Sequence, residues 1–282
     1  MRKLRSALLC GAVAAVVMLT GCKKYNVTST KPAVIEGFDG NTVDVSPQSG
    51  DLIATFEIEN FGEIKAVLFP KAAPVGVDNF QKLCDSGYYE GLKIHRVVAG
   101  FMLQGGSLNG NGTGGEAMIN GGQFDIETAQ NARHFYGALC YANAAGKNTT
   151  QFYIVNSNAP QTLDPNIGEK AVNSINYRLD QLNDNAKSLS QSEIDSTLFK
   201  IQYDQNALDF ESYASDEVRA RYLEKGGYAA LDGNYTVFGQ VYEGFDVIEA
   251  ISAVEVDYNE TGEPSKPVED IIIKNVSVSV YE

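Results

Sequence analysis

The sequence predicts a mainly β protein: a closed antiparallel barrel with two capping helices and an inserted α-helical lobe. Three observations support this fold class. The chain contains many short β-rich segments bounded by Gly or Asn, two segments of helical periodicity lie among them, and residues 161–227 are polar and lack strand alternation. Short strands joined by Gly-rich turns favour a closed antiparallel architecture, because closure leaves no exposed sheet edge.

The strand pattern begins with a β-hairpin. In "DLIATFEIENFGEIKAVLFP" (residues 51–70), two runs of alternating apolar residues are separated by "ENFG". A helix is expected next, in "APVGVDNFQKLCDSG" (residues 73–87). Pro74 lies near its start, apolar residues recur at helical spacing, and Gly87 follows as a stop.

Five further segments have the length and composition of strands. They are "LKIHRVV" (92–98), "GALCYAN" (137–143), "QFYIVNS" (151–157), "YTVFGQVYEG" (235–244) and "DIIIKNVSVSV" (270–280). Between the last two, "FDVIEAISAV" (245–254) is expected to form a short helix.

Residues 161–227 follow a helical pattern instead. Apolar residues recur at a 3-4 spacing from Val172 to Leu189, and Ser190 with Glu193 forms a capping-box pattern. The run "DEVRARYLEKGG" (216–227) ends with basic residues and then Gly, as helices commonly do. We expect two or three helices that form a lobe inserted into the barrel domain.

The N-terminus resembles a bacterial lipoprotein signal. Arg2, Lys3 and Arg5 precede an apolar run too short to span a bilayer as a mature anchor, and "LTGC" (19–22) follows. The resemblance implies removal of residues 1–21, lipidation of Cys22 and an extracytoplasmic location in the bacterial cell envelope, with the membrane contacted through the lipidated Cys22 only. An ordinary secretory signal that happens to contain Cys22 is the alternative.

The remaining chain divides into a tether and one interrupted domain. Residues 22–49 are polar and contain Pro, Gly, Ser and Thr, which predicts a lipid-anchored flexible tether with a mean span of about 25–30 Å. The folded domain is expected over residues 50–282, interrupted by the helical insertion at 161–227.

Composition disfavours several functions. The net charge is −14, from 22 basic and 36 acidic residues, whereas nucleic-acid-binding proteins gather Lys and Arg. The two histidines, His95 and His134, lie far apart in sequence, so we expect no metal site. Cys84 and Cys140 have no CxxC partner; two small buried thiols are favoured, and a disulfide between them stays open.

One glycine-rich run needs separate treatment. "GNGTGG" (110–115) fits the pattern of dinucleotide-binding loops. Such a site needs a helix directly after the loop, and "EAMINGGQFD" contains too much Gly for that helix. We therefore expect no cofactor.

Three separated motifs resemble the signatures of cyclophilins, the peptidyl-prolyl cis/trans isomerases. They are "HRVVAGFMLQGG" (95–106), "GALCYANAAGKNTTQFYI" (137–154) and "LDGNYTVFGQVYEGFDVIEAI" (231–251), in the family's order. The resemblance covers residues 51–160 and 228–282 and is interrupted by the helical segment. It implies an eight-stranded cyclophilin-like barrel and an isomerase of X–Pro bonds.

Such an isomerase needs no nucleophile, because the X–Pro bond rotates without being cleaved. The barrier is about 18–20 kcal/mol. At the twisted state the proline nitrogen gains a lone pair, so a fixed donor aimed at that nitrogen stabilises the twisted state more than the planar one. An Arg suits this role because it is always charged and carries a rigid fork of donors.

The resemblance assigns roles to individual residues. Arg96 is implied as the catalytic arginine, and Gln104 as the residue that holds Arg96 and the substrate backbone. The implied substrate-binding residues are Phe101, Met102, Tyr153 and Leu231 in the proline pocket, and Ala142, Asn143, Gln151 and Tyr235 along the groove. His95, beside the arginine, is implied to be structural.

The chain departs from the family at three of its usual positions. Tyr153 stands where Phe is frequent, Ala230 where many members have Trp, and Tyr235 where many have His. The departures leave Arg96 in place but affect affinity and sequence preference, and we expect weak cyclosporin binding.

The expected partners are proline-containing segments of exported proteins that are unfolded or folding, and the protein is expected to be a monomer. The alternative is a non-catalytic module on the same barrel, which grips proline segments or holds clients as a chaperone.

Overall fold

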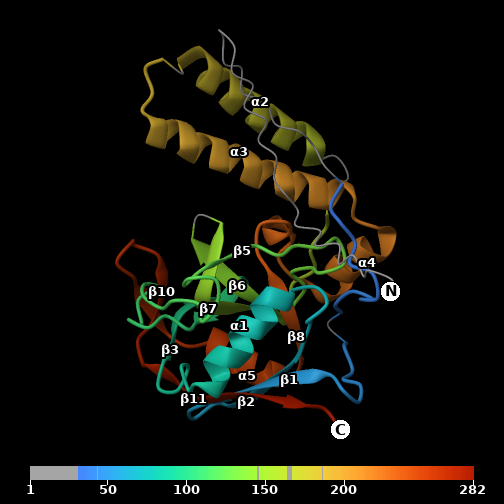
Figure 1. Ribbon diagram of the computed structural model, residues 1–282, viewed down its shortest axis with the longest axis vertical. Coiled ribbons are helices and arrows are strands. Elements are labelled where there is room, and N and C mark those ends of the chain that lie inside the picture. The colour runs from blue at the N-terminus through green and yellow to red at the C-terminus, as the bar shows by residue number, and fades with distance from the viewer. Residues whose placement is uncertain (1–30, 43, 145, 164–166, 186) are drawn as a thin grey trace, which may run out of the picture.

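Eight antiparallel strands close into a barrel, as predicted (Figure 1). Around the barrel the order is β4-β3-β11-β1-β2-β8-β6-β7, and β7 pairs with β4 to close it. The strands are β1 (Leu52–Ile58), β2 (Gly62–Leu68), β3 (Lys93–Val98), β4 (Met102–Gly105), β6 (Ala138–Ala144), β7 (Lys147–Val155), β8 (Val237–Glu243) and β11 (Ile271–Val280). A short extra strand, β5 (Phe124–Asp125), pairs with β7.

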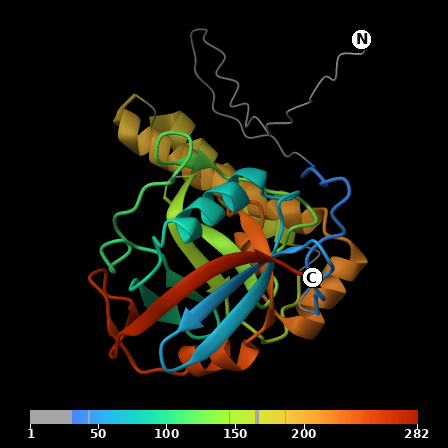
Figure 2. The ribbon, with the colours of Figure 1, turned by 60° about the horizontal axis from the view of Figure 1, so that its bottom comes forward.

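The computed structural model describes residues 31–282, except 43, 145, 164–166 and 186. The predicted signal peptide and Cys22 lie outside the described residues. Figure 2 shows the first and last strands side by side, blue against red, in agreement with the pairing of Leu52 with Val280.

Two predicted helices and a small hairpin complete the barrel domain. The helices are α1 (Pro74–Asp85) and α5 (Phe245–Ser252), and Pro74 occupies the first turn of α1 as expected. A second, two-stranded sheet is formed by β9 (Val256–Tyr258) and β10 (Pro264–Pro267), neither of which we predicted. A single 3₁₀ turn, η1 (Ala229–Leu231), precedes β8.

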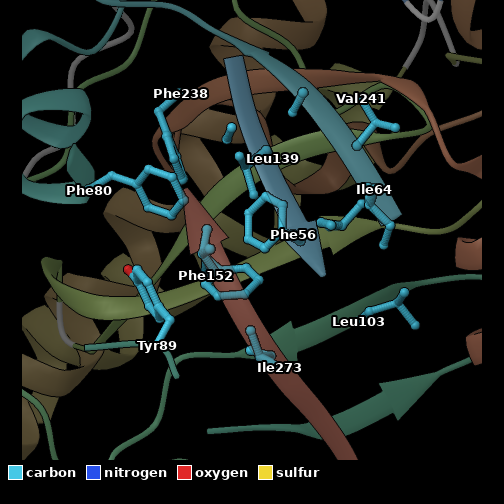
Figure 3. Close-up of a cluster of buried hydrophobic side chains, with 14 of the residues drawn as sticks. Phe56, Ile64, Phe80, Tyr89, Leu103, Leu139, Phe152, Phe238, Val241 and Ile273 are labelled. Carbon is cyan, nitrogen blue, oxygen red and sulfur yellow. The ribbon is translucent and has the colours of Figure 1, made fainter. Parts of the chain in front are cut away.

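Aromatic side chains fill the barrel interior (Figure 3). Phe80 of α1 is fully buried and its ring lies 5.9 Å from that of Phe56 and 5.1 Å from that of Phe238. The ring of Phe152 lies 5.1 Å from that of Phe56. The helix therefore caps the barrel by inserting an aromatic residue into its core.

A second cluster lies on the outer face of the same strands. Side chains alternate between the two faces of a strand, so Leu103 and Phe152 belong to the interior cluster while their neighbours Met102 and Tyr153 belong to the outer one. Leu231 also packs in the outer cluster. The strand alternation thus directs the second set of apolar residues away from the barrel core and toward one shared surface region.

Among the described residues, the insertion forms three helices, and the first two share a core of their own. They are α2 (Ile167–Asn185), α3 (Gln191–Ser212) and α4 (Asp216–Lys225). The buried residues of this core are Ile175, Leu182, Ile194, Ile201 and Leu208. The predicted capping box is present, because the Ser190 hydroxyl accepts from the Glu193 amide and the Glu193 carboxylate accepts from the Ser190 amide. In Figure 1, α2 and α3 lie above the barrel, whereas α4 lies beside it.

Residues 33–42 and 44–45 lie within the predicted tether, but several of them pack against the folded domain. Asn41 is 1% exposed, and its Nδ2 donates to the Arg133 carbonyl oxygen at 2.6 Å and to Gln240 Oε1 at 3.2 Å. Ile35, Phe38 and Val45 pack against the outer cluster. These contacts hold part of the predicted tether against the folded domain.

Both cysteines of the barrel are free and buried, so Cys84 and Cys140 do not pair. Among the described residues, no helix is long and apolar enough to cross a membrane.

Candidate active site

The pairing of β3, β4 and β7 brings residues of two motifs together. Arg96 on β3 lies opposite Gln104 on β4, and Gln104 lies opposite Tyr153 on β7. The third motif approaches through Leu231, which packs in the outer cluster with Met102 and Tyr153. Residues separated by more than a hundred positions therefore share one surface region of the barrel.

Arg96 is held by four neighbours. Its Nε and Nη2 donate to the two carboxylate oxygens of Glu263, at 2.6 and 2.7 Å. Its Nη1 donates to Gln104 Oε1 at 3.2 Å and lies 3.5 Å from Met102 Sδ. The guanidinium carbon lies 5.6 Å from the centre of the Phe101 ring. These contacts place a guanidinium of fixed orientation at the edge of the apolar cluster.

A chain of side-chain amides continues from the arginine. Gln104 Nε2 donates to Gln151 Oε1 at 3.1 Å, and Gln151 Nε2 donates to the Gly112 carbonyl oxygen at 2.9 Å. Because Gln104 accepts from Arg96 through its oxygen, its amide nitrogen must face Gln151, and the orientation of both amides is determined. Gly112 lies in the run 110–115, which is a loop with no helix after it.

Apolar residues form the floor beside the arginine. Met102, Tyr153 and Leu231 are buried there. The partly buried residues that pack against this floor include Phe101, Ala142 and Tyr235. The structure thus brings together every residue expected to line the proline pocket. Phe101 also lies 4.5 Å, ring to ring, from Tyr228, which sequence reasoning did not identify.

The Tyr153 hydroxyl is buried without a good partner. It faces the Cys140 thiol but makes no hydrogen bond of good geometry to any described residue. Burial holds the pKa of this phenol well above its usual range, so the ring stays neutral. The ring itself lies 6.1 Å from that of His134 and 5.8 Å from that of Tyr235. Tyr153 therefore acts as an apolar surface here, apart from its hydroxyl.

Asn143 uses its side chain within the protein. Its Nδ2 donates to the Asn234 carbonyl oxygen at 2.9 Å, and its Oδ1 accepts from the Gly146 amide at 3.2 Å. A β-bulge lies between Tyr141 and Asn143 where β6 pairs with β7. The side-chain amide thus shapes the β6–β7 hairpin and ties it to the segment before β8.

A buried ionic network supports the segment that carries Leu231. Asp232 accepts from Arg133 Nη1 at 2.8 Å, from the Tyr222 hydroxyl at 2.8 Å and from the His134 backbone amide at 3.0 Å, and it pairs with His134 Nδ1 at 2.8 Å. Burial raises the pKa of Asp232, but the Arg133 charge and the His134 hydrogen bond outweigh it and lower that pKa overall. Since Tyr222 belongs to α4, this network also joins the lobe to the barrel.

Two titratable groups next to the site have shifted pKa values. The hydrogen bonds from Arg96 lower the pKa of Glu263, so its carboxylate stays charged. Burial, assisted by the Arg96 charge, lowers the pKa of His95 to about 4. His95 is therefore neutral near neutral pH, and its two ring nitrogens have no well-aligned partner among the described residues.

Glu263 is the main residue that sequence reasoning missed. It lies between β9 and β10, 167 positions from Arg96 in the chain. An acidic residue in a Gly-containing turn is ordinary, and no local pattern connects it to a distant arginine. Only the packing of the β9–β10 hairpin beside β3 reveals the contact.

The arrangement can supply a directed cationic donor next to an apolar surface. An arginine has five N–H donors, and among the described residues no partner engages the second N–H of Nη2. Among those residues, too, no group of three or more His, Cys, Asp or Glu side chains is placed to hold a metal ion. The arginine can therefore donate to a developing lone pair on a bound amide.

Comparisons with known proteins identify the family. The family model of cyclophilin-type peptidyl-prolyl cis-trans isomerases matches residues 53–187 and 221–278. A Staphylococcus aureus (strain COL) protein with the provisional name peptidyl-prolyl cis-trans isomerase is 34% identical over 222 residues, which cover 78% of this chain and 88% of that protein. A Streptococcus pyogenes protein, provisionally named a bifunctional phosphatase and peptidyl-prolyl cis-trans isomerase, is 33% identical over 78% of this chain and 37% of its own length.

Solved structures show the same fold. The crystal structure of a Cryptosporidium parvum cyclophilin-type peptidyl-prolyl cis-trans isomerase has a TM-score of 0.53 and 22% identity, and covers 82% of this chain and 99% of that one. A second crystal structure of that protein, determined in the presence of the dipeptide Ala-Pro, has a TM-score of 0.52, also at 22% identity, and covers 81% and 99% of the two chains.

Proposed function

The chain belongs to the cyclophilin-type peptidyl-prolyl cis-trans isomerases, and we propose that it isomerises X–Pro bonds of exported proteins outside the cytoplasm, with Arg96 as the catalytic residue. One observation carries the assignment of the site. The Arg96 guanidinium is fixed by Glu263 and Gln104 at the edge of an apolar surface made by Met102, Tyr153 and Leu231.

The proposed mechanism is electrostatic. The proline ring of the substrate packs on the apolar surface, which excludes water from the amide. As the C–N bond twists, resonance is lost and the proline nitrogen gains a lone pair. An N–H of Arg96 donates to that nitrogen, and because the planar amide offers no such lone pair, the contact stabilises the twisted state selectively. No covalent bond forms or breaks, and no proton is transferred.

The neighbours of Arg96 limit its motion. A free arginine side chain samples many rotamers, and a mispositioned donor stabilises the twisted amide poorly. The carboxylate of Glu263 and the amide of Gln104 hold the guanidinium from two sides. Gln104 and Gln151 also supply polar edges along which a substrate backbone can bind, in keeping with the Ala-Pro dipeptide named for the Cryptosporidium structure.

The proposed location rests on the N-terminal sequence. The "LTGC" pattern supports lipidation of Cys22 and attachment to the envelope membrane. Metabolic labelling of the full-length chain with a fatty acid tests this. We expect label and membrane association in wild type and in Cys10→Ser, and loss of both in Cys22→Ser. Equal labelling of wild type and Cys22→Ser would contradict the anchor.

A refolding assay tests the role in folding and separates it from a non-catalytic holding function. Proline isomerisation takes roughly 10–100 s and limits the slow refolding phase of many proteins. We expect the mature chain with Cys22→Ser to accelerate a proline-limited phase of an exported protein, and the additional Arg96→Ala change to abolish the acceleration. Improved yield with an unchanged rate, equal in both proteins, would instead support the holding function.

A further inference from the structure

Helix α3 of the inserted lobe is fixed to the segment that carries Leu231 and Tyr235. Asn234 Nδ2 donates to the Tyr203 carbonyl oxygen at 2.9 Å, and Asn206 Nδ2 donates to Asn234 Oδ1 at 3.2 Å. Nearby, the Arg133 guanidinium stacks 5.0 Å from the Phe210 ring and donates to the Phe210 carbonyl oxygen at 3.1 Å. The C-terminal half of α3 therefore has a defined position beside the proposed proline pocket.

This placement creates a row of aromatic rings that leads out of the pocket. Tyr153 lies at its inner end, and its ring is 5.8 Å from that of Tyr235. Tyr235 is 6.3 Å from Tyr203, and Tyr203 is 6.5 Å from Phe199. Exposure rises along the row, from 4% at Tyr153, through the half-buried Tyr235 and Tyr203, to 47% at Phe199. The last two rings belong to the insertion.

The outer end of the row lies beside the groove. A β-carbon added at Gly146, between β6 and β7, would be 3.9 Å from Phe199 Cε2. The same hairpin carries Ala142 and Asn143, so Phe199 lies next to the expected groove rather than on a remote face of the lobe. Burial raises the pKa of the Tyr203 phenol, with Tyr235 adding to the effect, and the ring stays neutral. The row thus presents aromatic surface from the pocket outward.

We propose that Phe199 and Tyr203 extend the substrate groove and bind an aromatic or large aliphatic side chain that flanks the isomerised proline. This inference rests on the proposed function of the pocket. An extended chain advances about 3.3–3.6 Å per residue, so each step of the row corresponds to about two substrate residues. The recognised side chain then lies within about five residues of the proline. The barrel motifs supply the chemistry, and the lobe supplies preference among substrates.

Peptide specificity tests the proposal. The host peptide is an alanine peptide with one central proline, and a set of peptides carries a single Phe at each position from one to five residues before or after the proline. The measured quantity is kcat/KM for cis/trans exchange, followed by NMR with the mature chain carrying Cys22→Ser. The variants are Phe199→Ala and Tyr203→Ala. Tyr177→Ala, on α2 and 65% exposed, is the matched control.

We expect wild type and the Tyr177→Ala control to prefer at least one Phe-containing peptide over the host peptide by several-fold to about tenfold, the range given by one aromatic contact. In Phe199→Ala and Tyr203→Ala this ratio should fall toward one. A role of Tyr203 in folding alone would lower all rates together and leave the ratio unchanged. If Tyr203→Ala does not fold, Tyr203→Leu and the exposed Phe199 position decide the test.

Two outcomes overturn the inference and leave the proposed function standing: wild type isomerises all peptides equally well, or the preference survives in both variants. A wild type that accelerates no peptide at all overturns the proposed function as well. The wild-type rates therefore show whether the proposed function fails, and the ratios in wild type and the two variants show whether the inference fails.

Discussion

Glu263 binds the guanidinium of Arg96 through both carboxylate oxygens, at 2.6 and 2.7 Å, although 167 positions separate the two residues. The pair is only partly buried, with side-chain exposures of 28% for Arg96 and 36% for Glu263. An ion pair of this exposure adds little to global stability. We interpret Glu263 as a positioning residue, which acts on the reaction by orienting Arg96.

The first prediction concerns this positioning. Glu263→Gln removes the charge and one of the two acceptors, so Arg96 should sample other orientations. Because solvent screens this partly exposed pair, we expect the activation free energy to rise by only about 1 kcal/mol. This corresponds to a decrease of roughly fivefold in kcat/KM, which peptide isomerisation kinetics can measure.

Asp270→Asn is the matched control for Glu263→Gln. Asp270 pairs with Lys93 of β3 at 2.6 Å, with exposures of 59% and 41%, away from the contacts of Arg96. We expect unchanged kinetics for this variant. An unchanged or increased rate in Glu263→Gln would contradict a positioning role, and an increase would indicate that the carboxylate restrains the arginine.

The second prediction concerns pH. The pKa of His95 is lowered from 6.5 to about 4 in the folded protein. Between these pH values the unfolded chain binds a proton that the folded chain excludes. The contribution of His95 to the free energy of unfolding is therefore fully present above pH 6.5 and decreases as the pH falls toward 4. The loss attributable to His95 is on the order of 2–3 kcal/mol.

Urea denaturation at pH 7 and at pH 4.5 measures this effect. We expect the stability difference between the two pH values to be smaller in His95→Asn than in wild type. The NMR signals of the His95 ring should also show no titration near pH 6.5. A normal titration of that ring would refute the lowered pKa.

The third prediction concerns the Tyr153 hydroxyl. Because this buried group has no well-aligned partner among the described residues, Tyr153→Phe removes a desolvation penalty without breaking a bond. We expect unchanged stability or a gain of up to about 1 kcal/mol, and retained isomerase activity.

Tyr141→Phe provides the contrast. The hydroxyl of this buried tyrosine donates to the Gly76 carbonyl oxygen at 3.0 Å and accepts from Asn79 Nδ2 at 3.1 Å. Its removal should cost about 1–3 kcal/mol, because the Asn79 donor and the Gly76 acceptor lose a partner. Equal destabilisation by the two substitutions in thermal unfolding would show that Tyr153 also has a strong partner.

The fourth prediction concerns the link between lobe and barrel. The side chains of Asp232 and Arg133 are both 1% exposed, so Asp232→Asn leaves a buried cation without its counter-charge. We expect a loss on the order of 3–5 kcal/mol in the free energy of unfolding. Asp204→Asn breaks the Arg178–Asp204 pair, whose side chains are 35% and 30% exposed, and should cost less than about 1 kcal/mol. Similar losses in both variants would contradict the dominant role of Asp232.

Local patterns predicted much of this fold. The hairpin of β1 and β2, the start of α1 at Pro74 and the capping box at Ser190 are each encoded within a few neighbouring residues. The motifs also named residues that the structure brings together: the first two motifs meet through strand pairing, and the third approaches through the 3₁₀ turn that carries Leu231. The hairpin, the helix start and the capping box were predictable because the residues that form each feature are neighbours in the sequence.

Long-range contacts were not predictable in this way. Glu263 reaches Arg96 through a separate hairpin, and Tyr203 reaches Tyr235 through an inserted helix. The segment around Asn41 is polar and lacks periodicity, so its sequence resembles a tether. The side-chain amide of Asn41 is nevertheless buried and donates to the Arg133 carbonyl oxygen and to Gln240. In each case the contact depends on how distant elements pack, and no local pattern encodes it.

The central claim is that Arg96 lowers the barrier to X–Pro rotation. The most direct measurement follows cis/trans exchange of a proline peptide by NMR with the mature chain carrying Cys22→Ser, with and without Arg96→Ala. We expect the first protein to accelerate exchange and the second to be slower by about 10²–10³, the range for loss of one transition-state donor. Equal acceleration by both folded proteins would contradict the claim.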